Sequence, residues 1–209
     1  MAKPKRSELQ LLERRIARCR LCVEAPTGKP LPHEPNPIVH LSPTARLCIA
    51  GQAAGTLAHA SSKPFNDPSG VRLRDWMGIT PDEFYDRSRL AIVPMGLCFP
   101  GLDERGSDLP PRRECAPRWR PEIFAAMPQV ELLLAIGQYA QAWHLGSLRG
   151  KTLTETVANW RAIFEATESP KVLPLPHPSW RNNAWIRRNP WFETELLPVL
   201  RAEVARLMA

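Results

Sequence analysis

Four short apolar runs recur along the chain, and each is bounded by polar or turn-forming residues. They are RLCIAG at 46–51, LAIVPM at 90–95, VELLLAIG at 130–137 and KVLPLP at 171–176. Runs of this length without a polar interruption are typical of strands that a sheet buries on both faces. We therefore predict four buried strands.

Segments with helical spacing of apolar residues occupy the intervals around these runs. The predicted helices are 7–19, 70–78, 81–88, 112–127, 137–146, 152–166 and 190–208. Residues 23–45 are rich in proline and have no steady period, so we expect an ordered loop there. Pro198 lies inside the last helical pattern, where a proline kinks or splits a helix.

Strands that alternate with helices indicate a parallel sheet with helices on both faces. The 209 residues suffice for a single domain of this kind, spanning residues 1–209. Ligands of such sheets bind beyond the carboxyl ends of the strands. Three of the runs lead into the segments GQAAG, PMGLCFPG and PLPHPSW, so we expect these ends to lie near each other.

The formal net charge of +7 favours a polyanionic partner, of which nucleic acid is the commonest. An arginine-rich and proline-rich composition can also reflect a GC-rich genome. No apolar run approaches the roughly 20 residues of a membrane-spanning helix, and the first ten residues lack the apolar core of a signal peptide. We therefore expect a cytoplasmic protein that has no membrane association and no evident obligate protein partner.

In a reducing compartment, cysteines serve more often as metal ligands or core residues than as disulfides. Cys19 and Cys22 form a C-x2-C pair, and Cys98 and Cys115 follow as a C-x16-C pair. Four thiolates can hold a zinc ion or an iron–sulfur cluster, although the short pair taken alone can be incidental. Cys48 lies inside an apolar run and is expected to be a small buried hydrophobe.

Three sequence elements follow each other in order: GQAAG at 51–55, KPFNDPSG at 63–70 and HPSW at 177–180. Together with the cysteine pattern, they resemble the uracil-DNA glycosylase superfamily, most closely its iron–sulfur branch, family 4, and related uncharacterised glycosylase-like proteins. The resemblance runs from about Cys19 to the last helix. It implies a three-layer α/β/α sandwich around a central four-stranded parallel sheet, in agreement with the predicted elements.

The resemblance also implies a structural 4Fe-4S cluster. Its ligands would be Cys19, Cys22, Cys98 and Cys115. Zinc remains the alternative, because four thiolates suit either metal.

The resemblance implies a base-binding pocket with assigned residues. The turn after the first strand would line the base and sugar with Gly51, Gln52, Ala53 and Gly55. Phe65 matches the aromatic that stacks on a base flipped out of DNA. His177 matches the histidine that reaches the base oxygen where negative charge develops as the glycosidic bond breaks.

On the DNA side, the resemblance suggests phosphate contacts at Ser69 and Ser179. Trp180 and Arg181 would fill the gap left by the flipped base or stack on single-stranded bases. The basic and aromatic residues continue through Trp191, a pattern that can also flank an amphipathic helix.

The chain lacks the acidic residue that the family pattern places in the turn after the first strand. Family 4 places a Glu where Gln52 stands, and family 1 places an Asp where Ala53 stands. Asp67 is the nearest carboxylate, and we expect it to position water together with Gln52.

A second departure concerns base recognition. Family 4 reads uracil with an asparagine where Pro94 stands, and a proline cannot make those hydrogen bonds. We expect Asn66, or backbone groups of Met95 and Gly96, to take over this contact, and another deaminated or oxidised base remains an alternative to uracil.

These observations predict a DNA repair glycosylase. It would flip a damaged base, with uracil expected, and hydrolyse the N-glycosidic bond to leave an abasic site. The missing acid also suits a catalytically weak or inactive lesion-binding or DNA-binding protein of the same fold. A third alternative is an enzyme that acts on free nucleosides or nucleotides, which would lack salt-sensitive DNA affinity.

Overall fold

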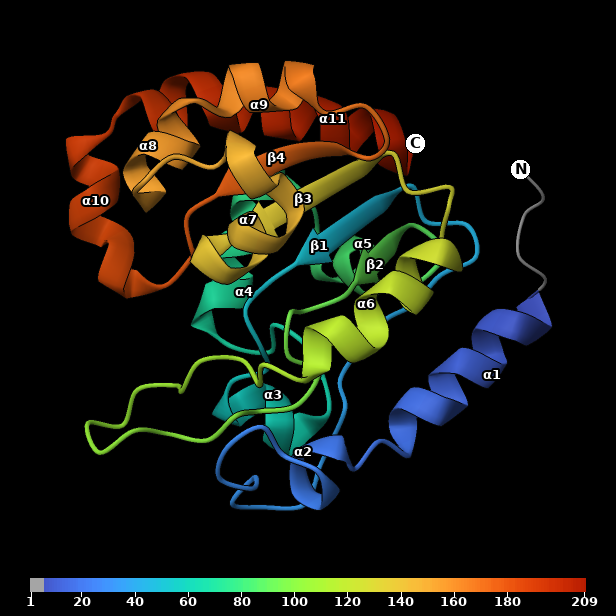
Figure 1. Ribbon diagram of the computed structural model, residues 1–209. Helices are drawn as coiled ribbons and strands as arrows, with labels where there is room; N and C mark the ends of the chain where they lie inside the picture. The colour runs from blue at the N-terminus through green and yellow to red at the C-terminus, as the bar shows by residue number, and fades with distance from the viewer. Residues whose placement is uncertain (1–5) are drawn as a thin grey trace.

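The computed structural model describes residues 6–209 and contains the predicted parallel sheet (Figure 1). β1 (Leu47–Ala50) and β3 (Leu132–Ile136) lie at its centre, and β2 (Leu90–Ile92) and β4 (Lys171–Leu175) form its edges. The order is β2-β1-β3-β4, and all three pairings in this sheet are parallel. The carboxyl ends of the strands therefore share one edge.

Different helices cover the two faces of the sheet (Figure 1). One core includes residues of three helices, α1 (Arg6–Ala17), α6 (Cys115–Ala125) and α7 (Gly137–Leu145). The other includes residues of α4 (Pro68–Met77), α5 (Pro81–Tyr85) and α11 (Leu197–Met208). Alternate residues of each strand belong to alternate cores, as the two-residue period of a strand requires. This arrangement confirms the α/β/α fold class.

Two predicted helices are divided in the structure. The segment 152–166 forms α8 (Leu153–Ala158) and α9 (Trp160–Ala166), which meet at Asn159. The last helical pattern begins as a π-helical turn, Phe192–Leu196, before α11 starts. Pro198 lies in the first turn of α11, where a helix does not need the missing N–H.

Three short helices were not predicted: α2 (Leu21–Glu24), α3 (Thr56–Ser61) and α10 (Asn183–Arg188). Segments of four to six residues are too short to show a helical period. Among the helices of residues 6–209, none combines the length and apolar character needed to cross a bilayer.

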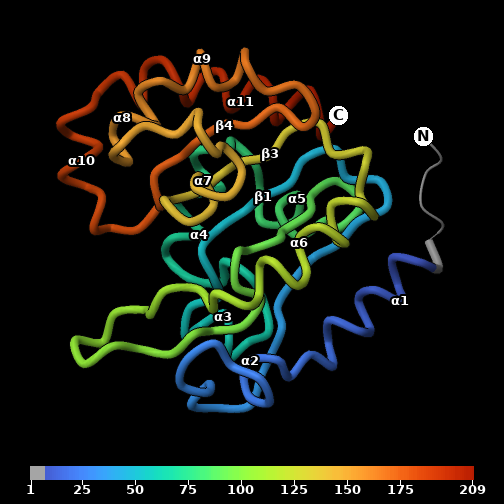
Figure 2. The backbone as a smooth tube through the Cα atoms, in the orientation of Figure 1, coloured from blue at the N-terminus to red at the C-terminus, as the bar shows by residue number. Residues whose placement is uncertain are grey.

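The segment between β2 and α6 leaves the sheet as a long loop with two adjacent arms (Figure 2). The Leu109 N–H donates to the Gly101 carbonyl across 2.9 Å, and Leu102 and Asp108 form an antiparallel bridge. The arms are therefore paired by backbone hydrogen bonds.

Candidate active site

A cleft of about 610 Å³ lies at the carboxyl edge of the sheet. Its walls come from the turn after β1, the segment leading into α4, the segment after β4 and the loop between β2 and α6. Most of the residues predicted for the site line this cleft: Gly51, Gln52, Ala53, Gly55, Phe65, Asp67, Ser69, His177, Ser179, Trp180 and Arg181. The structure thus brings together segments that lie more than 120 positions apart in the chain.

Three residues predicted to contact the base do not line the cleft. The backbone N–H groups of Met95 and Gly96 donate to the carbonyls of Gly51 and Gln52, each at 2.9 Å. These two N–H groups extend the sheet pairing beyond β2 and are therefore already hydrogen-bonded. Asn66 is exposed, and its amide donates to the Ser61 hydroxyl. The structure therefore places these three residues outside the lining of the cleft, and their role in base recognition stays a prediction.

Phe65 enters the cleft with an unusual backbone conformation. Its φ of 53° lies in the left-handed region, which residues other than glycine seldom adopt. The Tyr85 hydroxyl donates to the Phe65 carbonyl at 3.3 Å, which helps to hold this conformation. The ring points at the turn after β1, where a Cβ added to Gly51 would lie 3.2 Å from it. Gly51 therefore makes room for the aromatic ring.

Asp67 begins α4 as its N-cap. One carboxylate oxygen accepts the Gly70 N–H at 2.7 Å, which satisfies a backbone donor that the helix leaves free. The side chain also lines the cleft. Asp67 therefore has a structural role in addition to its place in the site, and one of its oxygens is already engaged.

His177 follows β4 and lines the same cleft as Asp67. The Asn182 amide donates to the His177 carbonyl at 2.7 Å and fixes the backbone at that point. Burial lowers the pKa of His177 below its usual value, while the carboxylates of Asp67 and Asp108 act in the opposite direction. The net lowering favours a neutral imidazole at neutral pH, with one N–H available as a donor.

The outer rim of the cleft carries the predicted DNA contacts. Ser69 lies in the first turn of α4, and the Ser179 hydroxyl accepts the Arg181 N–H at 3.2 Å. Trp180 is 70% exposed, and the Arg181 guanidinium carbon lies 5.8 Å from the centre of its ring. An exposed aromatic beside a cation suits the stacking of nucleic-acid bases.

The rest of the aromatic stretch does not belong to this rim. Trp185 and Trp191 are partly buried and pack against the core on the α11 face. The Trp185 indole N–H donates to the Thr154 hydroxyl at 2.8 Å. Of the two interpretations left open for these residues, the amphipathic flank is the one that the packing supports.

A comparison with protein-family models matches residues 38–201 to the model described as the uracil DNA glycosylase superfamily. The chain belongs to this superfamily. The match spans the cleft, from the turn at Gly51 to the segment containing His177 and Arg181. Members of the superfamily act on DNA and hydrolyse N-glycosidic bonds. Cys19 and Cys22 precede the matched range, so the match does not test the cysteine pattern of the iron–sulfur branch.

The four predicted ligand cysteines line one small cavity at the N-terminal end of α6. They are Cys19, Cys22, Cys98 and Cys115, and all four are free thiols. The Trp119 indole donates to the Cys19 sulfur and the Leu97 N–H to the Cys115 sulfur, each at 3.3 Å. Within residues 6–209, no group of three or more His, Cys, Asp or Glu side chains is positioned to hold a metal ion. The donor types and their convergence fit a cluster, but the thiols are not arranged as a finished coordination shell.

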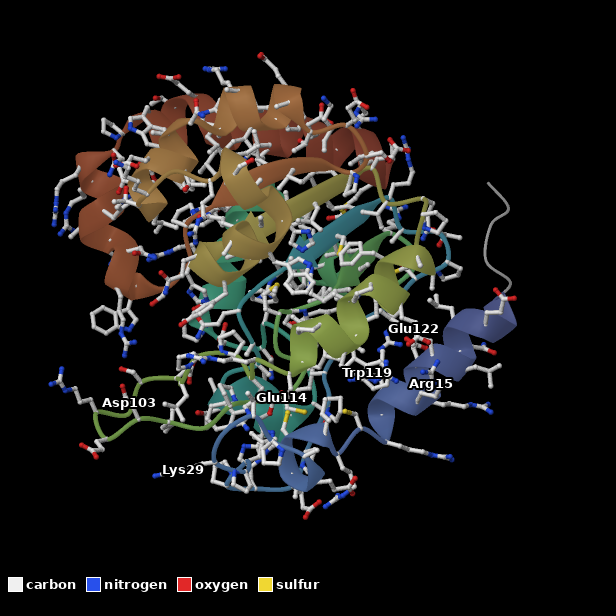
Figure 3. The ribbon with its side chains drawn as sticks, in the orientation of Figure 1. Arg15, Lys29, Asp103, Glu114, Trp119 and Glu122 are labelled. Atoms are coloured by element: carbon white, nitrogen blue, oxygen red, sulfur yellow. The ribbon has the colours of Figure 1, made fainter. Side chains whose placement is uncertain are left out.

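Contacts between helices bring the N-terminal cysteines to this cavity. Arg15 of α1 and Glu122 of α6 form an ion pair, and Figure 3 shows both side chains close to Trp119.

Burial raises the pKa of Cys98 and of Cys115 to about 12, so both thiols are protonated at neutral pH. Cys48 is fully buried in β1, as predicted.

Three further polar residues line the cleft that sequence reasoning missed. Asn182 holds the His177 carbonyl, and Arg72 donates to the Ser179 carbonyl at 3.1 Å. Both support the segment after β4. The third is Asp108, from the long loop between β2 and α6. No motif or period in the sequence distinguishes Asp108 from the other charged residues of its loop.

Proposed function

We propose that the protein is a DNA repair glycosylase that flips a damaged base into this cleft and hydrolyses its N-glycosidic bond, with uracil the expected base. The observation that carries the proposal is the shared cleft of Phe65 and His177 at the carboxyl edge of the sheet. One residue can replace the stacking that a flipped base loses, and the other can bind the anion that leaves. Both functions are needed to extrude a base from DNA and to cleave its glycosidic bond.

Phe65 would receive the base. A base extruded from the duplex loses its stacking neighbours, and an aromatic face returns about 1–3 kcal/mol of that stacking free energy. The ring packs edge-on against Phe84, with 5.9 Å between the ring centres. This packing keeps the ring in one orientation and lowers the entropy that binding must remove.

His177 would stabilise the leaving base. As the glycosidic bond breaks, its electron pair moves onto the base, and an N–H aimed at the base oxygen stabilises that charge. A neutral imidazole supplies this N–H, in keeping with the lowered pKa of His177. Removal of a single donor of this type costs roughly 100-fold to 1,000-fold in rate.

The DNA strand would cross the rim formed by Ser69, Ser179, Trp180 and Arg181. In the first turn of α4, Pro68 has no N–H and Asp67 accepts the Gly70 N–H. A phosphate there would therefore be bound by the N–H and hydroxyl of Ser69. Trp180 is exposed enough to enter the space that the flipped base vacates.

The cysteine cavity is proposed to hold a 4Fe-4S cluster, with zinc as the alternative. Cys19 and Cys22 come from the N-terminal segment, and Cys98 and Cys115 flank the long loop. A bound cluster would tie these parts of the chain together, and the N–H groups of Trp119 and Leu97 would donate to its sulfur ligands.

A strand-cleavage assay tests the function. Labelled oligonucleotides that carry one uracil, either single-stranded or opposite G or A, are incubated with protein and then treated with alkali. A second panel carries other deaminated or oxidised bases. His177→Ala is compared with wild type and with His33→Ala, a histidine that does not line the cleft. Cleavage that depends on the damaged base and is lost only in His177→Ala supports the proposal.

The other outcomes separate the alternatives. DNA binding without cleavage of any substrate contradicts catalysis and favours a lesion-binding protein. Hydrolysis of free nucleosides or nucleotides, without salt-sensitive DNA affinity, favours the third alternative.

A further inference from the structure

The long loop between β2 and α6 places a carboxylate in the cleft. Asp103 tightens the tip of this loop by accepting the N–H groups of Arg105 and Ser107, at 2.9 Å and 2.8 Å. The paired arms then carry Asp108 back to the cleft, which it lines. The loop is therefore held by its own hydrogen bonds, and these fix the backbone that carries Asp108.

The loop is attached to the turn that follows β1. The Gln52 side-chain amide donates to the Leu109 carbonyl at 3.3 Å. One carboxylate oxygen of Asp108 lies 3.4 Å from where a Cβ on Gly55 would stand. Gln52 occupies the place of the family's acid, and here its side chain holds the loop that delivers another acid.

Asp108 differs from Asp67 in how its oxygens are used. One carboxylate oxygen of Asp67 accepts the N-cap hydrogen bond of α4. Asp108 accepts none of the side-chain hydrogen bonds found within residues 6–209, so its oxygens stay free for water or substrate. The Asp108 residue is exposed overall, but partial burial of its carboxylate raises the pKa of Asp108. His177 and Arg181 lower this pKa, and the nearby carboxylate of Asp67 raises it. Asp108 lines the same cleft as His177, the proposed donor to the leaving base.

We propose that, in the glycosylase reaction proposed above, Asp108 is the carboxylate that activates water and Gln52 is the positioning residue that holds its loop. The C1′–N bond breaks with its electron pair on the base. The water oxygen bonds to C1′ and gives one proton to the Asp108 carboxylate. Asp108 releases that proton to solvent, and the base takes one up from solvent at its ring nitrogen. The carboxylate charge also stabilises the cation-like sugar before water attacks.

The experiment compares Asp108→Asn with Glu104→Gln, which removes an exposed acid from the same loop. Single-turnover cleavage rates are measured on the best substrate from the lowest pH at which the protein stays folded to mildly alkaline pH, together with DNA affinity. Loss of a general base costs roughly 100-fold or more. We expect that loss in Asp108→Asn, along with the acidic limb of its pH profile, while DNA affinity is kept. Glu104→Gln is expected to match wild type in rate and profile.

Gln52→Ala tests the positioning role. The acid is still present in this variant but its loop is less well held, so the rate is expected to fall while the acidic limb remains. A lost acidic limb in Gln52→Ala would contradict a role limited to positioning.

The outcomes separate this inference from the proposed function. An active wild type with Asp108→Asn equal to Glu104→Gln overturns the role of Asp108 and leaves the glycosylase proposal intact. A wild type inactive on every base overturns both. If thermal unfolding shows that Asp108→Asn is destabilised, Asp108→Glu decides. Glu keeps the charge and should keep the acidic limb at a reduced rate, and loss of that limb overturns the inference.

Discussion

Replacement of Gly70 by alanine should displace the ring proposed to stack on the base. Gly70 lies in the first turn of α4, and its N–H donates to Asp67. A Cβ at this position would lie 1.8 Å from the Phe65 carbonyl oxygen and 2.7 Å from its carbonyl carbon. Real Cβ atoms do not approach other heavy atoms closer than 3.0 Å, so the two segments must separate by at least about 1.2 Å.

The structure gives Phe65 little freedom to absorb this shift. Its backbone is already in the left-handed region, and its ring lies 3.2 Å from the Cβ position of Gly51. Misplacement of a reacting group by about 1 Å costs on the order of 100-fold in rate, or about 2.7 kcal/mol in activation free energy. The overpacking itself should lower the free energy of unfolding by roughly 1–3 kcal/mol.

Single-turnover cleavage of a uracil-containing strand measures the effect, well below the unfolding midpoint of the variant. Gly28→Ala is the matched control, because a Cβ at Gly28 meets nothing within 4 Å. The control should keep the wild-type rate and midpoint. A folded Gly70→Ala variant that cleaves within threefold of wild type would refute the proposed dependence on the placement of Phe65.

Further predictions concern other parts of the molecule. Burial lowers the pKa of His40 to about 4, so stability should fall as pH drops from about 6.5 toward 4. Urea denaturation at several pH values measures the slope of unfolding free energy against pH. His40→Gln should reduce this slope by less than ~1.4 kcal/mol per pH unit, because the ring is partly solvated. An unchanged slope would be contrary evidence. Thr80→Ala removes the capping box of α5 and should cost about 1 kcal/mol of unfolding free energy, measured in the same way; an unaltered midpoint would argue against it. Trp180→Ala should weaken single-stranded DNA binding by about 1–3 kcal/mol without changing its salt slope, whereas Arg181→Ala should reduce that slope by about 1. Salt titrations of binding distinguish the two, and identical slopes for both variants would refute the assignment. Cys98→Ser should lose the metal of the purified protein in elemental analysis for iron and zinc, and retention of wild-type metal content would speak against the proposed ligand set.

The hydrophobic pattern of the chain predicts the fold class and most of the secondary structure. The four apolar runs predict the strands because a parallel sheet covered on both faces needs residues that are apolar without interruption. The alternation with helices then places the ends of the strands at one edge. The segments containing Gly51 and His177 follow strands and are predicted to lie at this edge for that reason, whereas Phe65 is assigned to the site only by the resemblance to the uracil-DNA glycosylase superfamily.

Other features depend on contacts that no local pattern records. The order β2-β1-β3-β4 arises from pairing between distant strands. The division of 152–166 into two helices at Asn159 is not marked by the helical period of that segment. The backbone of Met95 was predicted to read a base, but the sheet pairing continues past β2 and uses its N–H. A periodic pattern reports which face of an element is buried, and it does not report which backbone groups a neighbouring strand will occupy.

Asp108 shows most clearly that a local sequence pattern does not report tertiary contacts. Asp67 is close to Phe65 in sequence and was the natural candidate, whereas Asp108 lies 56 positions beyond Gln52 in a loop with no period. The tertiary structure alone brings Asp108 to the cleft, through paired loop arms and a hydrogen bond from Gln52. Local sequence determines strands and helices because their periods are short. The position of a loop side chain is decided by tertiary contacts between residues far apart in the chain.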